Sequence, residues 1–277
     1  MPRKSQRQEP PEASAPLPGV VGVVLVALGL AAAPAAAHDY WLEADKPVVA
    51  PTEPVVVRLN LGAGMKIESE KPFEAARIER FELRYGDEFR DLMRSTREGV
   101  TPVFNEPIGA DQPFLFSMVR SVARIEMSGA EFDEYVAHEG IRGVKSRRAK
   151  ERERYWRFLK LLGRSGEQTE TDLHHRFTGT QFEIVLLQNP FTAATGEQIA
   201  QVLFETRPLP GATVTAMHRA DDGAVTRLTA VTDQRGVARF TLPQKGAWLF
   251  RTVHLRECRK CDDADWESFW AAYSAAY

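Results

Sequence analysis

Two short stretches of the chain carry side chains that could bind a transition metal. One is His38-Asp39, and the other is His254 followed by Cys258 and Cys261. Imidazole nitrogens and thiolate sulfurs together form a ligand set that suits Cu, Zn, Ni or Co. A single site built from both stretches would use His38 as its primary ligand and His254 as its second. Asp39 and the two cysteines would be supplementary ligands.

His38 gains a second ligand atom if it is the first residue of the mature protein. A basic start precedes an apolar run over residues 19–33, and the small residues Ala35 and Ala37 follow that run. This order is typical of a secretory signal peptide, here residues 1–37, cleaved after Ala37. The α-amine thereby released and the ring Nδ1 of His38 would chelate one ion at neutral pH.

An uncleaved membrane anchor is the alternative interpretation of this N-terminus. The apolar run has about 15 residues, whereas a membrane-spanning helix needs about 20. Prolines at Pro18 and Pro34 also bound it. The pattern favours cleavage and a periplasmic or secreted protein over a protein anchored in the inner membrane.

Cys258 and Cys261 are the two cysteines of the chain and form one Cys-x-x-Cys motif. An exported protein meets an oxidising environment, which favours a disulfide between them over metal ligation by two thiolates. Both interpretations stay open at this point.

The remaining histidines are not expected to form a site. His174 and His175 are neighbours in a polar linker, where an extended chain would direct them to opposite sides, so we expect both on the surface. His138 and His218 have no companion at ligand spacing. No nucleophile elbow, phosphate-binding loop or pair of catalytic carboxylates is recognisable, so an enzyme is not expected.

The charge balance is nearly neutral, with 36 Lys plus Arg against 38 Asp plus Glu. Nucleic-acid-binding proteins usually carry a basic stripe, and none is visible here, so nucleic acid is not an expected partner.

The first part of the mature chain, residues 38–190, is predicted to be a β-sandwich lobe. Residues 54–61 alternate apolar and polar side chains, and residues 76–85 do so with a slip of parity that indicates a β-bulge. A charged helical insertion is predicted over about residues 128–162, with Ser128 as N-cap and Glu131 completing a capping box.

Residues 191–277 are predicted to form a second sandwich, because short strands alternate with turns. A terminal helix is expected to bury Trp266 and Trp270, which are four residues apart. The fold class is therefore mainly β, with two immunoglobulin-like or prealbumin-like β-sandwich lobes.

Two resemblances support this division. Pro208–Val214, Thr232-Asp233, Gly236 and Gly246 before Trp248 resemble the carboxypeptidase-regulatory-like, prealbumin-type sandwich, which specifies a fold and no chemistry.

The whole mature chain resembles a bacterial family of unknown function. Its members are described as the predicted periplasmic component of cobalt or nickel ABC transport. The marks of the resemblance are His38–Glu43, Glu131–Tyr135, Arg152–Tyr155, Phe182–Val185, Asn189-Pro190, Val253-His254 and Asp265–Trp270.

The expected function is an exported protein that binds a divalent transition metal (Ni, Co, Cu or Zn) for uptake. The resemblance implies the membrane subunits of a metal transporter as partners. A non-catalytic periplasmic or surface interaction module is the alternative. A copper oxygenase with an N-terminal histidine brace is the third possibility, although no further axial ligand or flat substrate face is recognisable.

Export should cleave the chain between Ala37 and His38, because Ala35 and Ala37 follow the apolar run at the spacing that signal peptidase requires. Intact mass or N-terminal sequencing of the exported protein measures the start. A retained leader, or a start at another residue, would remove the chelate and with it the metal-binding hypothesis.

Overall fold

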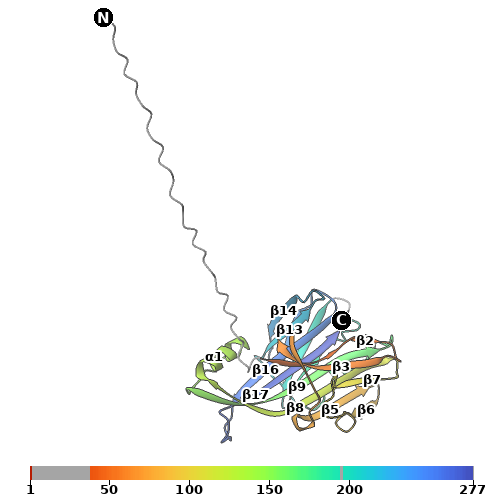
Figure 1. The fold of residues 1–277 in the computed structure, drawn as a ribbon, viewed down its shortest axis with the longest axis horizontal. Coiled ribbons are helices and arrows are strands. Elements are labelled where there is room, and N and C mark those ends of the chain that lie inside the picture. The colour runs from red at the N-terminus through yellow and green to blue at the C-terminus, as the bar shows by residue number, and fades with distance from the viewer. Residues whose placement is uncertain (2–37, 194–195, 277) are drawn as a thin grey trace. The chain divides into compact units, whose positions relative to one another are not determined.

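A mixed β-sheet that runs through both halves of the chain organises the fold (Figure 1). The computed structural model describes residues 1, 38–193 and 196–276, so the predicted signal peptide and its cleavage bond lie outside the described residues. In spatial order the sheet contains β14 (Val225–Val231), β13 (Thr213–Arg219), β16 (Ala247–Glu257), β17 (Trp266–Ala276), β9 (Lys150–Ser165), β8 (Gln112–Ser128), β5 (Ile78–Tyr85) and β6 (Glu88–Asp91), with β2 (Val48–Val49) beside β9. We call it the central sheet.

Two smaller antiparallel sheets complete the strands. The β3 sheet contains β1 (Asp39–Ala44), β3 (Pro54–Ala63), β4 (Lys66–Lys71) and β7 (Phe104–Pro107), and the β11 sheet contains β10 (Phe182–Leu186), β11 (Glu197–Phe204), β12 (Arg207–Pro208) and β15 (Val237–Thr241). The helices are α1 (Gly129–His138) and the 3-10 turns η2 (Ala75–Arg77) and η3 (Leu173–His175). No helix in the described part of the chain is long and apolar enough to cross a membrane.

The central sheet is covered on both faces. On one face Trp41 and Leu59 of the β3 sheet pack with Phe116 of β8. On the other face Ile184 and Val202 of the β11 sheet pack with central-sheet side chains that include Phe250 and Phe269. The predicted mainly-β class is confirmed. The boundary expected at residue 190 does not separate two sheets, because the central sheet takes strands from both sides of it.

The predicted helical insertion is correct only at its start. Ser128 and Glu131 form the expected capping box, and α1 follows it. The helix ends at His138, however, and the charged run leads into strand β9. Strand β9 carries apolar side chains on both faces, because Leu159 and Leu161 contact one core while Phe158 and Leu162 contact the other, which explains why the pattern has neither helical nor strand period.

The predicted terminal helix is wrong, because residues 266–276 form strand β17, parallel to β9 and antiparallel to β16. Trp266 and Trp270 do lie on one face, against α1. A spacing of four is even, so a strand also places both rings on the same side. Every residue of β17 is buried, and this tertiary environment overrides the helix propensity of its alanines.

A buried ion pair joins the central sheet to the β11 sheet. Lys160 of β9 donates from Nζ to Glu183 Oε2 of β10 at 2.6 Å, and the two side chains are each 5% exposed. Two backbone carbonyls accept further hydrogen bonds from the same ammonium group at 3.1 Å, those of Arg176 and Ile184. Burial lowers the pKa of Lys160, and the Glu183 carboxylate opposes that shift.

Glu183→Gln should destabilise the fold by about 3 kcal/mol, because it leaves a buried ammonium without a counter-charge. Lys160→Met combined with Glu183→Gln should recover more than half of that loss, because no unpaired charge remains. Urea unfolding measures both. Glu53→Gln, which breaks the exposed pair with Lys46, is the matched control and should cost less than about 1 kcal/mol. Equal losses in the Glu183 and Glu53 variants would contradict the interpretation.

Candidate functional site

The structure does not bring His38 and His254 together. Asp39, which follows His38, contacts Arg251 of β16. His254 lies three residues further along the same strand, and residues an odd number apart point to opposite faces. Its ring centroid lies 4.5 Å from that of Phe204 in the β11 sheet. The predicted two-histidine site is therefore wrong, since the central sheet separates the two residues.

His38 lies directly before β1, next to the β3 sheet. Its Nε2 is 3.0 Å from Oε2 of Glu68 on β4, and its side chain is 23% exposed. Its backbone carbonyl faces Arg157 Nη2 at 3.4 Å. Glu68 was not singled out from the sequence, because no local pattern connects a residue of β4 with one thirty positions earlier; the β3–β4 pairing decides it.

Asp39 is an anchor and not a free ligand. Its Oδ1 accepts from Nε of Arg251 at 2.6 Å, and Arg251 also donates from Nη2 to Glu139 Oε2 at 2.7 Å. The three side chains are between 3% and 7% exposed. Burial raises the pKa of Asp39, while the Arg251 guanidinium opposes that shift. This group ties β1, the end of α1 and β16 to one another.

His254 packs in an aromatic cluster. Besides Phe204, its ring lies near Phe182 and Phe269, with centroids 6.2 Å away in each case. Burial lowers its pKa to about 4, and the nearby Arg256 cation adds to the shift. The ring is neutral at neutral pH and contributes to packing.

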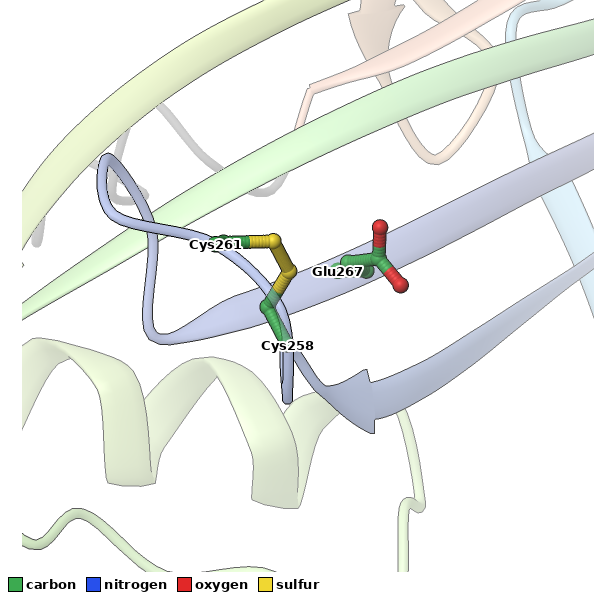
Figure 2. Close-up of side chains that lie close together, drawn as sticks. All are labelled: Cys258, Cys261 and Glu267. Atoms are coloured by element: carbon green, nitrogen blue, oxygen red, sulfur yellow. A yellow bond between two sulfur atoms is a disulfide. The ribbon is translucent and has the colours of Figure 1, made fainter.

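Cys258 and Cys261 are joined in a disulfide, the form favoured for an exported protein. Figure 2 shows the bridge in the loop between β16 and β17, with Glu267 on β17 close to it. These three residues form the one group within the described residues whose potential metal ligands all lie within 4.8 Å of one another. Disulfide sulfurs are not thiolates, so in this state the cysteines are not metal ligands.

Glu267 is already engaged by two guanidinium groups. Oε1 accepts from Nε of Arg154 at 2.9 Å, and Oε2 accepts from Nε of Arg256 at 2.8 Å. Burial acts to raise the pKa of Glu267, but the hydrogen bonds and charges of Arg154 and Arg256 together lower it.

His174 is buried, so the expected surface position is wrong for this residue. Its Nε2 lies 3.1 Å from Nδ1 of His175. The prediction assumed an extended chain, whereas the 3-10 turn η3 turns both rings to the same side. The two imidazole rings therefore contact each other. The Tyr273 hydroxyl of β17 donates to the His174 carbonyl at 3.1 Å.

Partly buried His254 should make the protein less stable in acid. The unfolded chain binds the imidazole proton near pH 6.5, whereas the folded chain binds it only near pH 4. The unfolded state therefore holds more protons between these values, and stability falls as the pH drops through this window, by up to about 1.4 kcal/mol per pH unit.

Urea unfolding of wild type and His254→Leu across pH 4–7 tests this expectation. Burial raises the pKa of Glu153 to about 7, so this group makes the free energy of unfolding rise as the pH falls, opposite to His254. The quantity to measure is therefore the difference in unfolding free energy between wild type and His254→Leu at each pH. The difference should grow as the pH falls. His138→Gln, at an exposed position of α1, is the control and should leave the profile unchanged. Parallel profiles for wild type and His254→Leu would contradict the neutral state of the His254 ring.

Comparisons with known proteins identify the family of the chain but indicate no activity. No curated protein matches the chain. One solved structure that is similar, a tetra-tandem repeat in the extending region of a large adhesion protein, has 9% sequence identity and a TM-score of 0.20. The match covers 86% of this chain and 49% of that one, so this chain spans about half its length. A TM-score of 0.20 is too low to indicate a shared fold.

The family model described as a domain of unknown function (DUF4198) matches residues 35–256. The match includes His38, the β3 sheet, α1 and β16 as far as residue 256. The chain therefore belongs to the DUF4198 family.

Proposed function

We propose that the protein is exported and binds a divalent transition metal through His38 as its N-terminal residue. The observation that carries the proposal is the contact between His38 Nε2 and Glu68 at 3.0 Å. A carboxylate that accepts a hydrogen bond from one ring nitrogen fixes the tautomer in which the other nitrogen carries a lone pair. Metal-binding histidines are commonly oriented in this way.

The two ligand atoms of this proposed chelate come from one residue. With the proton on Nε2, the Nδ1 lone pair of His38 and the α-amine released by cleavage can bind the same ion. Both nitrogens must lose or lack a proton to do so, which the amine pKa near 8 allows at neutral pH. Nitrogen ligands of this kind suit Ni, Co, Cu or Zn.

The residues that follow His38 hold the N-terminus in place. Asp39 is bound by buried Arg251, and the Tyr40 ring lies under the guanidinium groups of Arg120 and Arg157, whose carbon atoms are 4.5 and 4.4 Å from its centroid. A ligand whose backbone is fixed before binding loses less conformational entropy when the metal arrives.

Two nitrogens from one residue leave other coordination positions to water or to a second protein. Such an open chelate suits capture and transfer of an ion, and it supports delivery to the membrane subunits of a metal transporter as the role of this protein. It supports a copper oxygenase less well, because the second imidazole expected for that chemistry, His254, lies beyond the central sheet.

Titration calorimetry with Ni²⁺, Co²⁺, Cu²⁺ and Zn²⁺ on the mature protein tests the proposal. One alanine added before His38 should remove most of the affinity, because the amine becomes an amide. Glu68→Gln should weaken binding by about tenfold, because the carboxylate orients the ring. Affinity should also fall with pH, since protons compete for both nitrogens.

Glu79→Gln, at an exposed position on β5, is the matched control for Glu68→Gln and should bind like wild type. Equal affinity of the extended and mature forms would overturn the chelate. An intact chelate with unchanged affinity in Glu68→Gln would overturn only the role of Glu68.

A further inference from the structure

The loop that connects β16 to β17 contains a disulfide with two cations between its cysteines, whereas Asp263 and Asp265, which follow the bridge, are paired with Arg124 and Arg152. Cys258 and Cys261 are partly exposed, and the two residues between them, Arg259 and Lys260, are exposed cations. An open cavity of about 610 Å³ lies against the bridge, and all four of these residues line it.

The hairpin is held together without the disulfide. The N–H of Cys258 donates to the Asp265 carbonyl at 2.9 Å, and the N–H of Asp265 donates to the Arg152 carbonyl at 2.8 Å. The Asp265 carboxylate accepts from the N–H of Arg152 at 3.0 Å. A bridge across two intervening residues also restricts the unfolded chain far less than a long loop does. The bond is therefore a small contribution to the stability of the fold.

The charges at the cavity favour a thiolate. Its cations are Arg154, Arg256, Arg259 and Lys260, against the carboxylates of Glu257 and Glu267. Arg154 and Arg256 are paired with Glu267, and Glu257 is paired with Arg147, so Arg259 and Lys260 supply most of the excess positive charge at the cavity. Neighbouring cations stabilise a cysteine thiolate, and a stabilised thiolate is a better leaving group in disulfide exchange.

We propose that Cys258–Cys261 is a thiol–disulfide exchange site for small anionic thiols, a role separate from metal binding at His38. A thiolate of the reductant attacks one Sγ and forms a mixed disulfide. The Cys258–Cys261 bond breaks, and its electron pair goes to the other Sγ, which leaves as a thiolate. A second reductant thiol then releases the first as its disulfide. Two thiols are oxidised and one protein disulfide is reduced to two cysteine thiols.

A metal site made by the reduced cysteines and Glu267 is the competing interpretation. It requires a cation to enter a cavity that four basic side chains line, and to displace guanidinium groups from Glu267. The charges that stabilise a thiolate and attract an anionic thiol work against that cation. The geometry therefore favours exchange.

The test is the rate at which glutathione, an anionic thiol, opens the bridge in the folded, exported protein. Maleimide–polyethylene glycol labelling after an acid quench counts the released thiols. Arg259→Gln combined with Lys260→Gln should slow the reaction by at least about threefold, because attraction of the reductant and stabilisation of the leaving thiolate are both reduced. Cysteamine, a cationic thiol, should show a smaller decrease or none.

Arg94→Gln combined with Arg97→Gln removes two exposed charges from the segment between β6 and β7 and should leave the rate unchanged. Cys258→Ser combined with Cys261→Ser should keep the circular dichroism spectrum of the fold. A bridge that opens only in denaturant, or equal rates in all variants, would overturn the proposal. Zinc bound by the reduced protein so tightly that oxidised glutathione no longer restores the bridge would overturn it in favour of a metal site.

Discussion

Burial of the central sheet on both faces is the constraint on which the rest of the structure depends. The β3 sheet and α1 cover one face, and the β11 sheet covers the other. Strands β9 and β17 lie at its middle, and no residue of β17 is exposed. Polar groups on these strands need partners, because an unpaired buried charge is strongly destabilising. Glu151 accepts from the Trp266 indole at 2.8 Å, and Lys160 pairs with Glu183 at 2.6 Å.

Arg251 shows how the need to pair buried charges fixes the start of strand β1. It projects from β16 and binds Asp39 at the start of β1 and Glu139 just after α1, so three segments far apart in sequence meet at one guanidinium. The position of His38 follows from this contact and from the pairing of β1 with β3. A buried ion pair of this kind contributes little net stability, but it holds β1 in one position relative to β16.

The two places proposed to carry chemistry have different charged neighbours. His38 lies beside the Glu68 carboxylate. The disulfide loop lies beside a cavity with four basic side chains, which suits an anion. The ligand set predicted as one site is therefore divided between His38, the aromatic cluster around His254 and the disulfide loop.

The sequence by itself determined the class of the fold, the capping box at Ser128 and the bulge in β5, because these depend on alternation and on residues a few positions apart. It also favoured the disulfide, whose two cysteines are three residues apart. Only the tertiary structure decided that residues 266–276 form a strand and that His254 packs, partly buried, among aromatic rings. Both depend on which layer covers which face of a sheet. Two residues four positions apart, such as Trp266 and Trp270, lie on one side of either a helix or a strand, so their spacing does not distinguish the two when every residue is buried. The contact of His38 with Glu68 was decided in the same way, since it requires the pairing of β1, β3 and β4.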